Sequence, residues 1–247
     1  MARCGADRLC WFIDLKELIM GLFSDLYNQV DVFLKERWEM EDARVVPDPD
    51  DLRLRNHAKK LNAVVLYADL ADSTALVDAY AYKPQVVTRL YKAFLHCAAS
   101  LIRANNGEIV AYDGDRIMAI YIGDSKNTNA VATSFKINYA VNEIINKKST
   151  VSIKHVVGID RSDLFISRIG IRNANDLVWV GRAANYAAKL SSLSDNYQSY
   201  VTDDIYQAMA RDLREHYSWF RWSKGWKPYT DANPIKVWFS NSSISFV

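Results

Sequence analysis

The sequence predicts an α+β fold in which helices cover one face of a mainly antiparallel sheet. Three observations lead to this prediction: a near-continuous apolar run at 61–70, an alternating hairpin pattern at 108–122, and several segments with apolar residues at helical spacing. Strands and helices mix along the chain without strict alternation. That order favours such a layered fold over a parallel sheet with crossover helices.

The composition limits the size and the class of the protein. The 247 residues allow one large domain, or a domain of ~150–200 residues plus an extension. A net charge of +2 gives no basic excess of the kind that nucleic-acid binders carry, so we expect no nucleic-acid partner. Three cysteines at unrelated spacings form neither a disulfide framework nor a zinc set, which suits a cytoplasmic location.

The first part of the chain, 1–50, is predicted to be a helical segment followed by a linker. Apolar residues recur at helical spacing at Leu15, Leu18, Ile19, Leu22, Leu26, Val30 and Phe33. This helix has three possible roles: packing on the main domain, packing on a second subunit, or lying on a membrane surface. Charged residues interrupt the segment, so it predicts neither a signal peptide nor a membrane span. The prolines and acids of Arg44–Asp51, "RVVPDPDD", predict the linker, and the main domain then occupies 51–247.

The first half of the main domain predicts a strand, helices and a hairpin. Leu61–Leu70 is typical of a central buried strand, and Ala71–Tyr82 predicts short helical turns. Pro84 suits the start of a helix that runs to Asn105. The hairpin strands are Glu108–Tyr112 and Arg116–Ile122, followed by the loop "GDSKNTN".

The second half continues the mixture of helices and strands. The expected helices are Ala130–Ile145, Arg182–Leu193 and Asp203–Leu213. Val151–Ile159 and Leu164–Ile169 are expected to form a second pair of strands, and Leu177–Val180, Tyr200–Thr202 and the aromatic stretch Trp219–Phe239 are further strand-like segments.

The stretch Ala111–Tyr121, "AYDGDRIMAIY", carries the first sign of chemistry. Asp113 and Gly114 explain a tight turn, but Asp115 has no structural role there. Another acid, Asp69, ends the predicted central strand, which is a natural neighbour of the hairpin. Two carboxylates in partly buried surroundings repel each other unless cations compensate. Two divalent ions would do so, and a two-metal site serves phosphoryl displacement.

Other phosphate-binding and hydrolytic motifs are absent from the sequence. The chain has no GxxxxGK[ST] loop, no H-E-x-x-H and no G-x-S-x-G. Backbone N–H groups at the helix start in 71–74 would offer an alternative contact for an anion.

Three motifs in order carry a family resemblance. "LYADLADST", "AYDGDRIMAIY" and "VWVGRAANYAAKLSS" together resemble the class III nucleotidyl cyclase domain, over about Leu61 to Phe239. With "IGDSKNT" and "KHVVGID", the sequence looks most like the pyrimidine cyclases of bacterial Pycsar anti-phage systems. The resemblance implies a ferredoxin-like core. It also implies a homodimer, because the sites of this family form between two catalytic domains.

The resemblance also implies roles for individual residues. Asp69 and Asp115, with the backbone carbonyl of Leu70, would hold two divalent ions, Mn²⁺ or Mg²⁺. Asn185 would orient the ribose. Lys189 stands where purine cyclases usually have an arginine on the transferring phosphate, and lysine would provide a point charge instead of a planar fork. Either Lys224 or Lys227 would match a further phosphate-contacting lysine.

The base-binding positions depart from those of adenylate cyclases. Where these enzymes have a lysine and an aspartate, this chain has Ala111 and Val178, flanked by Tyr112 and Trp179. A pyrimidine substrate follows, and the resemblance favours conversion of UTP to 3′,5′-cyclic UMP and pyrophosphate. The product would act as a second messenger on a separate effector protein in antiviral defence. The alternative functions are a cytidylate cyclase, an adenylate or guanylate cyclase, and a non-catalytic nucleotide-binding dimerisation module. For Tyr112 and Trp179, the alternative to base binding is packing in the core or in an interface.

Overall fold

The computed structural model describes residues 6–193 and 197–246, with side chains from residue 19 onward. The chain forms two compact units. The smaller comprises Met1–Glu41, Pro47–Lys59 and Ser167–Val178, and the larger comprises Asp42–Val46, Lys60–Ile166 and Trp179–Val247. The boundary expected near residue 50 stays a prediction, because β2, β5 and β6 each run through both units.

Helix α1 (Ala6–Lys35) begins the smaller unit and confirms the expected N-terminal helix from residue 6 onward, while Met1–Gly5 lie outside the described residues. Its C-terminal end is closed by Asn56, whose Nδ2 donates to the carbonyls of Val32, Phe33 and Glu36 at 2.9–3.2 Å. The side chain thus satisfies carbonyls that a helix end leaves without partners. Among the residues described, no helix is long and apolar enough to cross a membrane.

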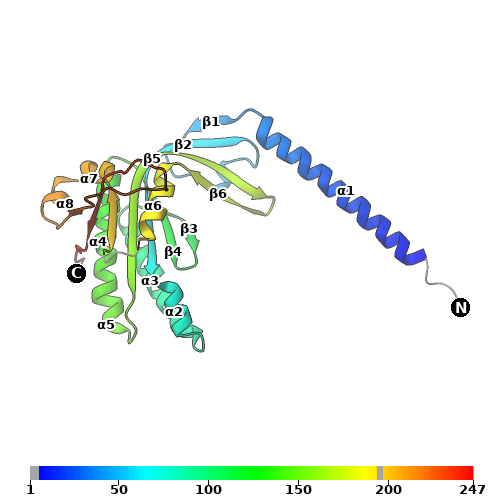
Figure 1. Ribbon diagram of the computed structural model, residues 1–247. Coiled ribbons are helices and arrows are strands. Elements are labelled where there is room, and N and C mark those ends of the chain that lie inside the picture. The colour runs from blue at the N-terminus through cyan, green and yellow to red at the C-terminus, as the bar shows by residue number, and fades with distance from the viewer. Residues whose placement is uncertain (1–5, 194–196, 247) are drawn as a thin grey trace. The chain divides into compact units, whose positions relative to one another are not determined.

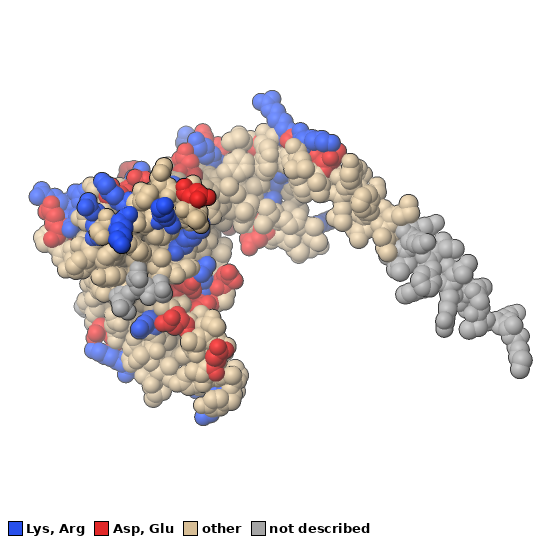
Figure 2. Space-filling model, in the orientation of Figure 1, with Lys and Arg blue, Asp and Glu red and all other residues tan. Residues whose placement is uncertain are grey.

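The described part of α1 exposes many apolar side chains, and Figure 2 shows much of it in tan. Met20 is 72 % exposed, Phe23 69 % and Leu34 78 %. Beyond the helix, β1 (Glu39–Asp42) pairs with β2, and a short 3₁₀ turn spans Pro49–Asp51. The segment predicted as helix and linker therefore also contains a strand.

The strands form one mixed sheet, shown in Figure 1. Within the described residues the order is β3-β4-β2-β5-β7-β9-β8, with β1 beside β2 and β6 beside β5. The bounds are β2 His57–Ala71, β3 Glu108–Asp113, β4 Arg116–Tyr121, β5 Lys154–Ile171, β6 Ala174–Val180, β7 Ser199–Thr202, β8 Phe220–Arg221 and β9 Val237–Ser240. Antiparallel pairing joins β2 to β4, β3 to β4, β7 to β9 and β8 to β9, whereas β5 and β7 are parallel.

The helices of the larger unit build its core against the sheet. Their bounds are α2 Ser73–Ala79, α3 Pro84–Ala104, α4 Lys126–Tyr139, α5 Asn146–Lys148, α6 Arg182–Ser191, α7 Asp203–Ala208 and α8 Arg211–Glu215. Leu66 and Ala68 of β2 pack with Phe94 of α3 and Phe135 of α4, and all four are fully buried. The predicted α+β class is confirmed.

One helix, α6, lies on the opposite face of the sheet. Residues 157 and 159 of β5 belong to the core beneath α3 and α4, so Val156 and Gly158 point the other way. Val156 packs with Leu190 of α6. A Cβ on Gly158 would lie 2.2 Å from the carbonyl oxygen of Ala187 and 2.5 Å from the amide nitrogen of Ser191. The missing side chain therefore lets α6 approach β5 closely.

Most predicted elements are confirmed, with changes at their ends. The predicted central strand, the hairpin and the helix that begins at Pro84 are β2, β3–β4 and α3. The helix predicted over 130–145 starts earlier and continues as a π-helix, Ala140–Ile145. The helix predicted over 203–213 is broken into α7 and α8.

The second pair of strands was a wrong prediction. Residues 154–159 of the first predicted strand and all of Leu164–Ile169 belong instead to the single strand β5, while residues 151–153 precede it. The polar residues between them are not a turn, because Asp160 is buried and accepts a hydrogen bond from Thr202 Oγ1 at 2.5 Å. Their polarity serves side-chain contacts along a continuous strand.

Candidate active site

The pairing of β2 with β4 brings the end of the central strand to the hairpin. Ala68 lies opposite Ile117, so Asp69 and Arg116 come next along the two strands. Gly114 occupies the hairpin turn at φ 60°, a left-handed conformation that glycine adopts without strain. Asp115 therefore lies in the turn, directly before the first residue of β4, and its charge acts on Asp69.

The two acids share an electrostatic environment. Burial raises the pKa of Asp69 above its ordinary value, and the charge of Asp115 raises it further, while Arg116 lowers it. The Asp69 side chain is 14 % exposed and accepts hydrogen bonds from Arg116 Nε at 2.9 Å and Nη2 at 2.6 Å. The structure thus brings together the two acids that the sequence analysis selected.

These residues fit a site for divalent cations. Asp115 Oδ2 is buried and has no hydrogen-bond partner among the described residues. A buried carboxylate oxygen without a partner, beside a second carboxylate, is an environment that a cation stabilises. No group of three or more His, Cys, Asp or Glu gathers in the described part of the chain. With two carboxylates, the remaining ligands would be main-chain carbonyls, water and substrate phosphates, the set that Mg²⁺ commonly uses.

A pocket of about 720 Å³ opens beside Asp69. Its wall includes Leu70 and the start of α2 at 71–75, together with Arg116, Lys154 and Ser192. The volume lies within the ~300–1,000 Å³ typical of small-molecule sites. The segment predicted to offer backbone N–H groups to an anion therefore lines the same pocket as a predicted metal ligand.

The other predicted residues do not line this pocket. Asn185 and Lys189 are exposed on α6, and Lys189 Nζ donates to the Pro228 carbonyl at 2.6 Å. Lys224 and Lys227 are exposed between β8 and β9. Ala111, Val178 and Trp179 are partly buried, and Tyr112 is 57 % exposed. Of the predicted set, Asp69 and Leu70 line the pocket, whereas Asp115 and the residues named here do not.

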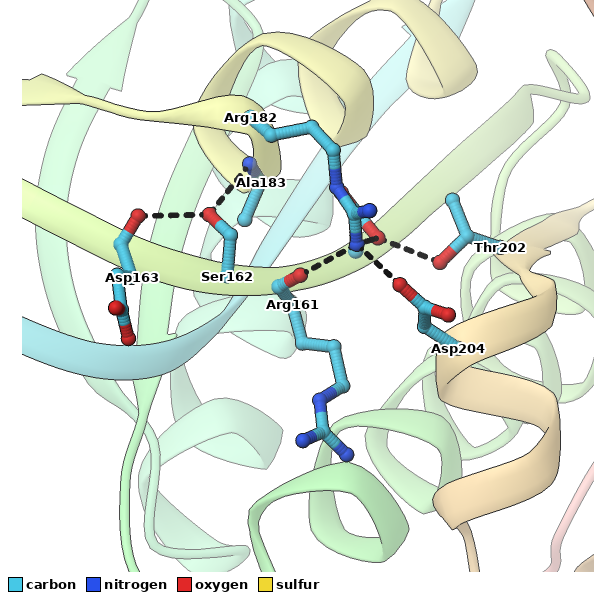
Figure 3. Close-up of polar contacts among 8 residues, drawn as sticks. Arg161, Ser162, Asp163, Arg182, Ala183, Thr202 and Asp204 are labelled. Carbon is cyan, nitrogen blue, oxygen red and sulfur yellow. Dashed lines mark hydrogen bonds and ion pairs between the residues drawn. The ribbon is translucent and has the colours of Figure 1, made fainter. Parts of the chain in front are cut away.

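A polar network that the sequence analysis missed fixes the start of α6 (Figure 3). Arg182 donates to Asp160 at 3.1 and 3.2 Å, to Asp204 at 2.5 Å and to the Arg161 carbonyl at 2.8 Å. Ser162 Oγ accepts the backbone N–H of Ala183 at 3.0 Å. The signal in the sequence is the polar run at 160–163 inside β5, which lies between the two strands predicted there.

The buried acid of this network depends on its partners. Burial raises the pKa of Asp160, while the hydrogen bond from Thr202 and the charge of Arg182 lower it. An ion pair at such a site is costly to break, because one charge is left buried alone. The network therefore holds the first turn of α6 on β5, close in sequence to Asn185.

His155, on β5 in the wall of the pocket, should make stability depend on pH. Burial lowers its pKa from 6.5 to about 3, and its Nε2 has no hydrogen-bond partner among the described residues. Above pH 6.5 His155 is neutral in both states. Between pH 6.5 and about pH 3, His155 is protonated in the unfolded chain but stays neutral in the folded chain, so the folded state loses stability as the pH falls.

We therefore expect His155 to lower the free energy of unfolding by about 2 kcal/mol between pH 7 and pH 5. Urea unfolding of the wild type and His155→Phe at both pH values tests this, since the variant should lose that part of the pH dependence. His96→Phe changes an exposed histidine on α3 and is the control. Equal pH dependence in the wild type and His155→Phe would contradict the expectation.

Comparison with known proteins identifies the family. Residues 56–221 match the adenylate and guanylate cyclase catalytic domain. A uridylate cyclase of Xanthomonas perforans is 42 % identical over 222 residues, covering 86 % of this chain and 95 % of the relative. A uridylate cyclase of Burkholderia cepacia is 47 % identical over 203 residues, covering 79 % and 87 %.

Solved structures agree on the fold. The crystal structure of the guanylyl cyclase Cya2 superimposes with a TM-score of 0.64 at 18 % identity, covering 76 % of this chain and 95 % of that one. The expected family resemblance is thus confirmed by sequence and by fold. The chain belongs to the adenylate and guanylate cyclase catalytic domain family, the class III nucleotidyl cyclases.

Proposed function

We propose that the protein is a uridylate cyclase that converts UTP to 3′,5′-cyclic UMP and pyrophosphate. The observation that carries the proposal is the 42 % and 47 % identity, over most of both chains, to two proteins named uridylate cyclase. The paired carboxylates beside the pocket supply the chemistry that such a reaction needs. The proposal includes a cytoplasmic location and a cyclic product that acts on a separate effector protein in antiviral defence.

Asp69 and Asp115, with the Leu70 carbonyl, would hold two divalent ions, Mn²⁺ or Mg²⁺. When bound, such ions lower the pKa of the ribose 3′-hydroxyl and stabilise the charge that develops at the α-phosphorus. The 3′-oxygen forms a bond to the α-phosphorus, the bond to the bridging oxygen breaks, pyrophosphate leaves, and the hydroxyl proton passes to solvent. The two carboxylates would hold these ions in the site.

The second group of residues would bind and orient the nucleotide. Asn185 would fix the ribose and Lys189 would place its charge on the transferring phosphate. To do so, the Lys189 ammonium group must leave the Pro228 carbonyl that it contacts in the isolated chain. Lys224 or Lys227 would contact a further phosphate.

The nucleotide test uses all four triphosphates in one reaction. Cyclic UMP should predominate, cyclic CMP should be second, and purine products should be minor. Ala111 and Val178 offer no side-chain partner to a purine edge, and each polar group left unpaired costs ~1–3 kcal/mol. Chromatographic separation of the cyclic products with Mn²⁺ present measures the preference. A predominance of cyclic AMP or cyclic GMP would overturn the proposed base specificity.

A homodimer with shared sites is part of the proposal. It is supported by the lining of the pocket beside Asp69, which includes neither Asn185 nor Lys189 of the same chain. In a symmetric dimer, each site would take the metal ligands from one subunit and the α6 residues from the other.

Mixing two inactive variants tests the sharing. Asp69→Asn chains mixed with Asn185→Ala chains should regain activity, because one of the two sites in each mixed dimer receives both intact halves. Cyclic UMP formation is measured before and after mixing, and native mass spectrometry of one isotope-labelled chain verifies exchange. Exchange without recovered activity would place the whole site within one subunit.

A further inference from the structure

Arg116 forms an ion pair with a carboxylate, Asp69, that is expected to hold a metal ion. Its Nε and Nη2 both donate to the same oxygen of Asp69, Oδ2, at 2.9 and 2.6 Å. Nη2 also donates to Ser192 Oγ at 3.2 Å, and the guanidinium lies 5.9 Å from the centre of the Tyr67 ring. A protein cation thus neutralises one of the two carboxylates that would hold divalent ions.

A metal ion and this guanidinium would compete for Asp69. They carry charges of the same sign, and both need the same partly buried carboxylate, whose side chain is only 14 % exposed. Repulsion between like charges a few ångströms apart is substantial where solvent screening is weak. A divalent ion on Asp69 would therefore weaken the contact from Arg116 and release the side chain.

Once released, the Arg116 side chain would be able to bind an anion in the pocket. Arg116 is 29 % exposed and lines the same pocket as the start of α2 and Lys154. Tyr67 and Ser192 contact the guanidinium and would keep it at the pocket. A guanidinium group forms two parallel hydrogen bonds with a phosphate, a geometry that a lysine cannot reproduce.

We propose that Arg116 exchanges partners during substrate binding: it neutralises Asp69 in the metal-free protein and binds a phosphate of the triphosphate once metal occupies Asp69. The proposal rests on the proposed function, because it assumes a metal-bound nucleoside triphosphate in this pocket. It makes Arg116 both a counterion of the empty site and a substrate-binding residue of the filled one.

The test measures binding by calorimetry, with no turnover required. In Arg116→Gln, Mn²⁺ should bind the nucleotide-free protein at least about tenfold more tightly, because no cation has to be displaced from Asp69. At saturating Mn²⁺, tripolyphosphate should bind about tenfold more weakly, the usual effect of losing one charge-assisted hydrogen-bonded contact.

Two further variants separate the two roles. Arg116→Lys keeps the positive charge, so its Mn²⁺ affinity should stay near the wild-type value, while tripolyphosphate should still bind more weakly. Arg211→Gln removes an exposed arginine paired with Glu215 and should change neither affinity. Circular dichroism and thermal unfolding verify that each variant is folded.

The outcomes are distinct. An unchanged or weaker Mn²⁺ affinity in Arg116→Gln would overturn the exchange at Asp69, and unchanged tripolyphosphate binding would overturn the phosphate contact. Tripolyphosphate carries no base or ribose, so both results are independent of the uridylate assignment. If the two shifts occur but the wild type forms no cyclic UMP, the exchange stands and the proposed function fails.

Discussion

Asp115→Asn is expected to abolish cyclase turnover and leave the fold intact. The carboxylate oxygen Oδ2 is buried without a hydrogen-bond partner among the described residues, so its removal breaks no structural contact there. The amide of asparagine keeps the shape but loses the charge that a divalent ion needs. Loss of an outer-shell partner alone costs ~10–100-fold in metal affinity or activity, and loss of a direct ligand should exceed that range.

Rates of cyclic UMP formation at saturating Mn²⁺, beside thermal unfolding of the same samples, measure both effects. Asp69→Asn should also abolish the formation of cyclic UMP. Asp113→Asn is the matched control two residues earlier, since asparagine serves the same turn with Gly114 and should retain most activity. Near-normal turnover by Asp115→Asn would remove this carboxylate from the metal site, and an inactive Asp113→Asn would mean that the wrong acid of the hairpin was chosen.

Gly158→Ala is expected to have the largest effect on stability. The added methyl would meet backbone atoms of α6 at 2.2 and 2.5 Å, and backbone cannot rotate aside as a flexible side chain can. Either α6 moves off β5 or the strand distorts. Overpacking of a core commonly costs ~1–3 kcal/mol, and contact with backbone should place this variant at about 3 kcal/mol or more.

Urea unfolding at pH 7 measures the loss. Gly21→Ala is the control, because a Cβ there meets nothing within 4 Å and the residue lies inside α1. Alanine in a helix interior should stabilise it by ~0.5–1 kcal/mol relative to glycine. A free energy of unfolding for Gly158→Ala within about 1 kcal/mol of the wild type would show that α6 is free to shift, and would contradict the close packing.

Sequence patterns predicted the elements in which apolar and polar residues alternate, as in a strand, or in which apolar residues recur at helical spacing. The central strand around Leu66, the hairpin with its Asp113–Gly114 turn and the helix from Pro84 all follow local rules of spacing and turn chemistry. The continuation of β5 through Asp160 does not follow such local rules. This buried acid is stabilised by Arg182 and Thr202, which lie far along the chain. Period and polarity carry no information about such partners.

In the candidate site, too, some features follow from local sequence and others depend on tertiary contacts. Asp115 stands out in the sequence because the turn explains only Asp113 and Gly114, and Asp69 stands out because it ends a strand expected beside the hairpin. The structure gives these two acids a shared electrostatic environment. The contact of Arg116 with Asp69 was not predicted, since it depends on the register of β2 against β4. Which residues of α6 line the pocket likewise depends on the tertiary fold.

The register of β2 against β4 also determines the stage of folding at which the proposed metal site can form. The β3–β4 hairpin joins residues that are close in sequence, such as Asp113 and Arg116, and such local structure forms on a microsecond timescale. The pairing of Val64 with Tyr121 closes a much longer loop, and that closure comes with a larger entropy cost and a slower step. Asp115 therefore emerges early from a local hairpin but meets Asp69 only after the long-range closure. A divalent ion that needs both acids can bind only after that step, so added metal should slow unfolding far more than it speeds folding.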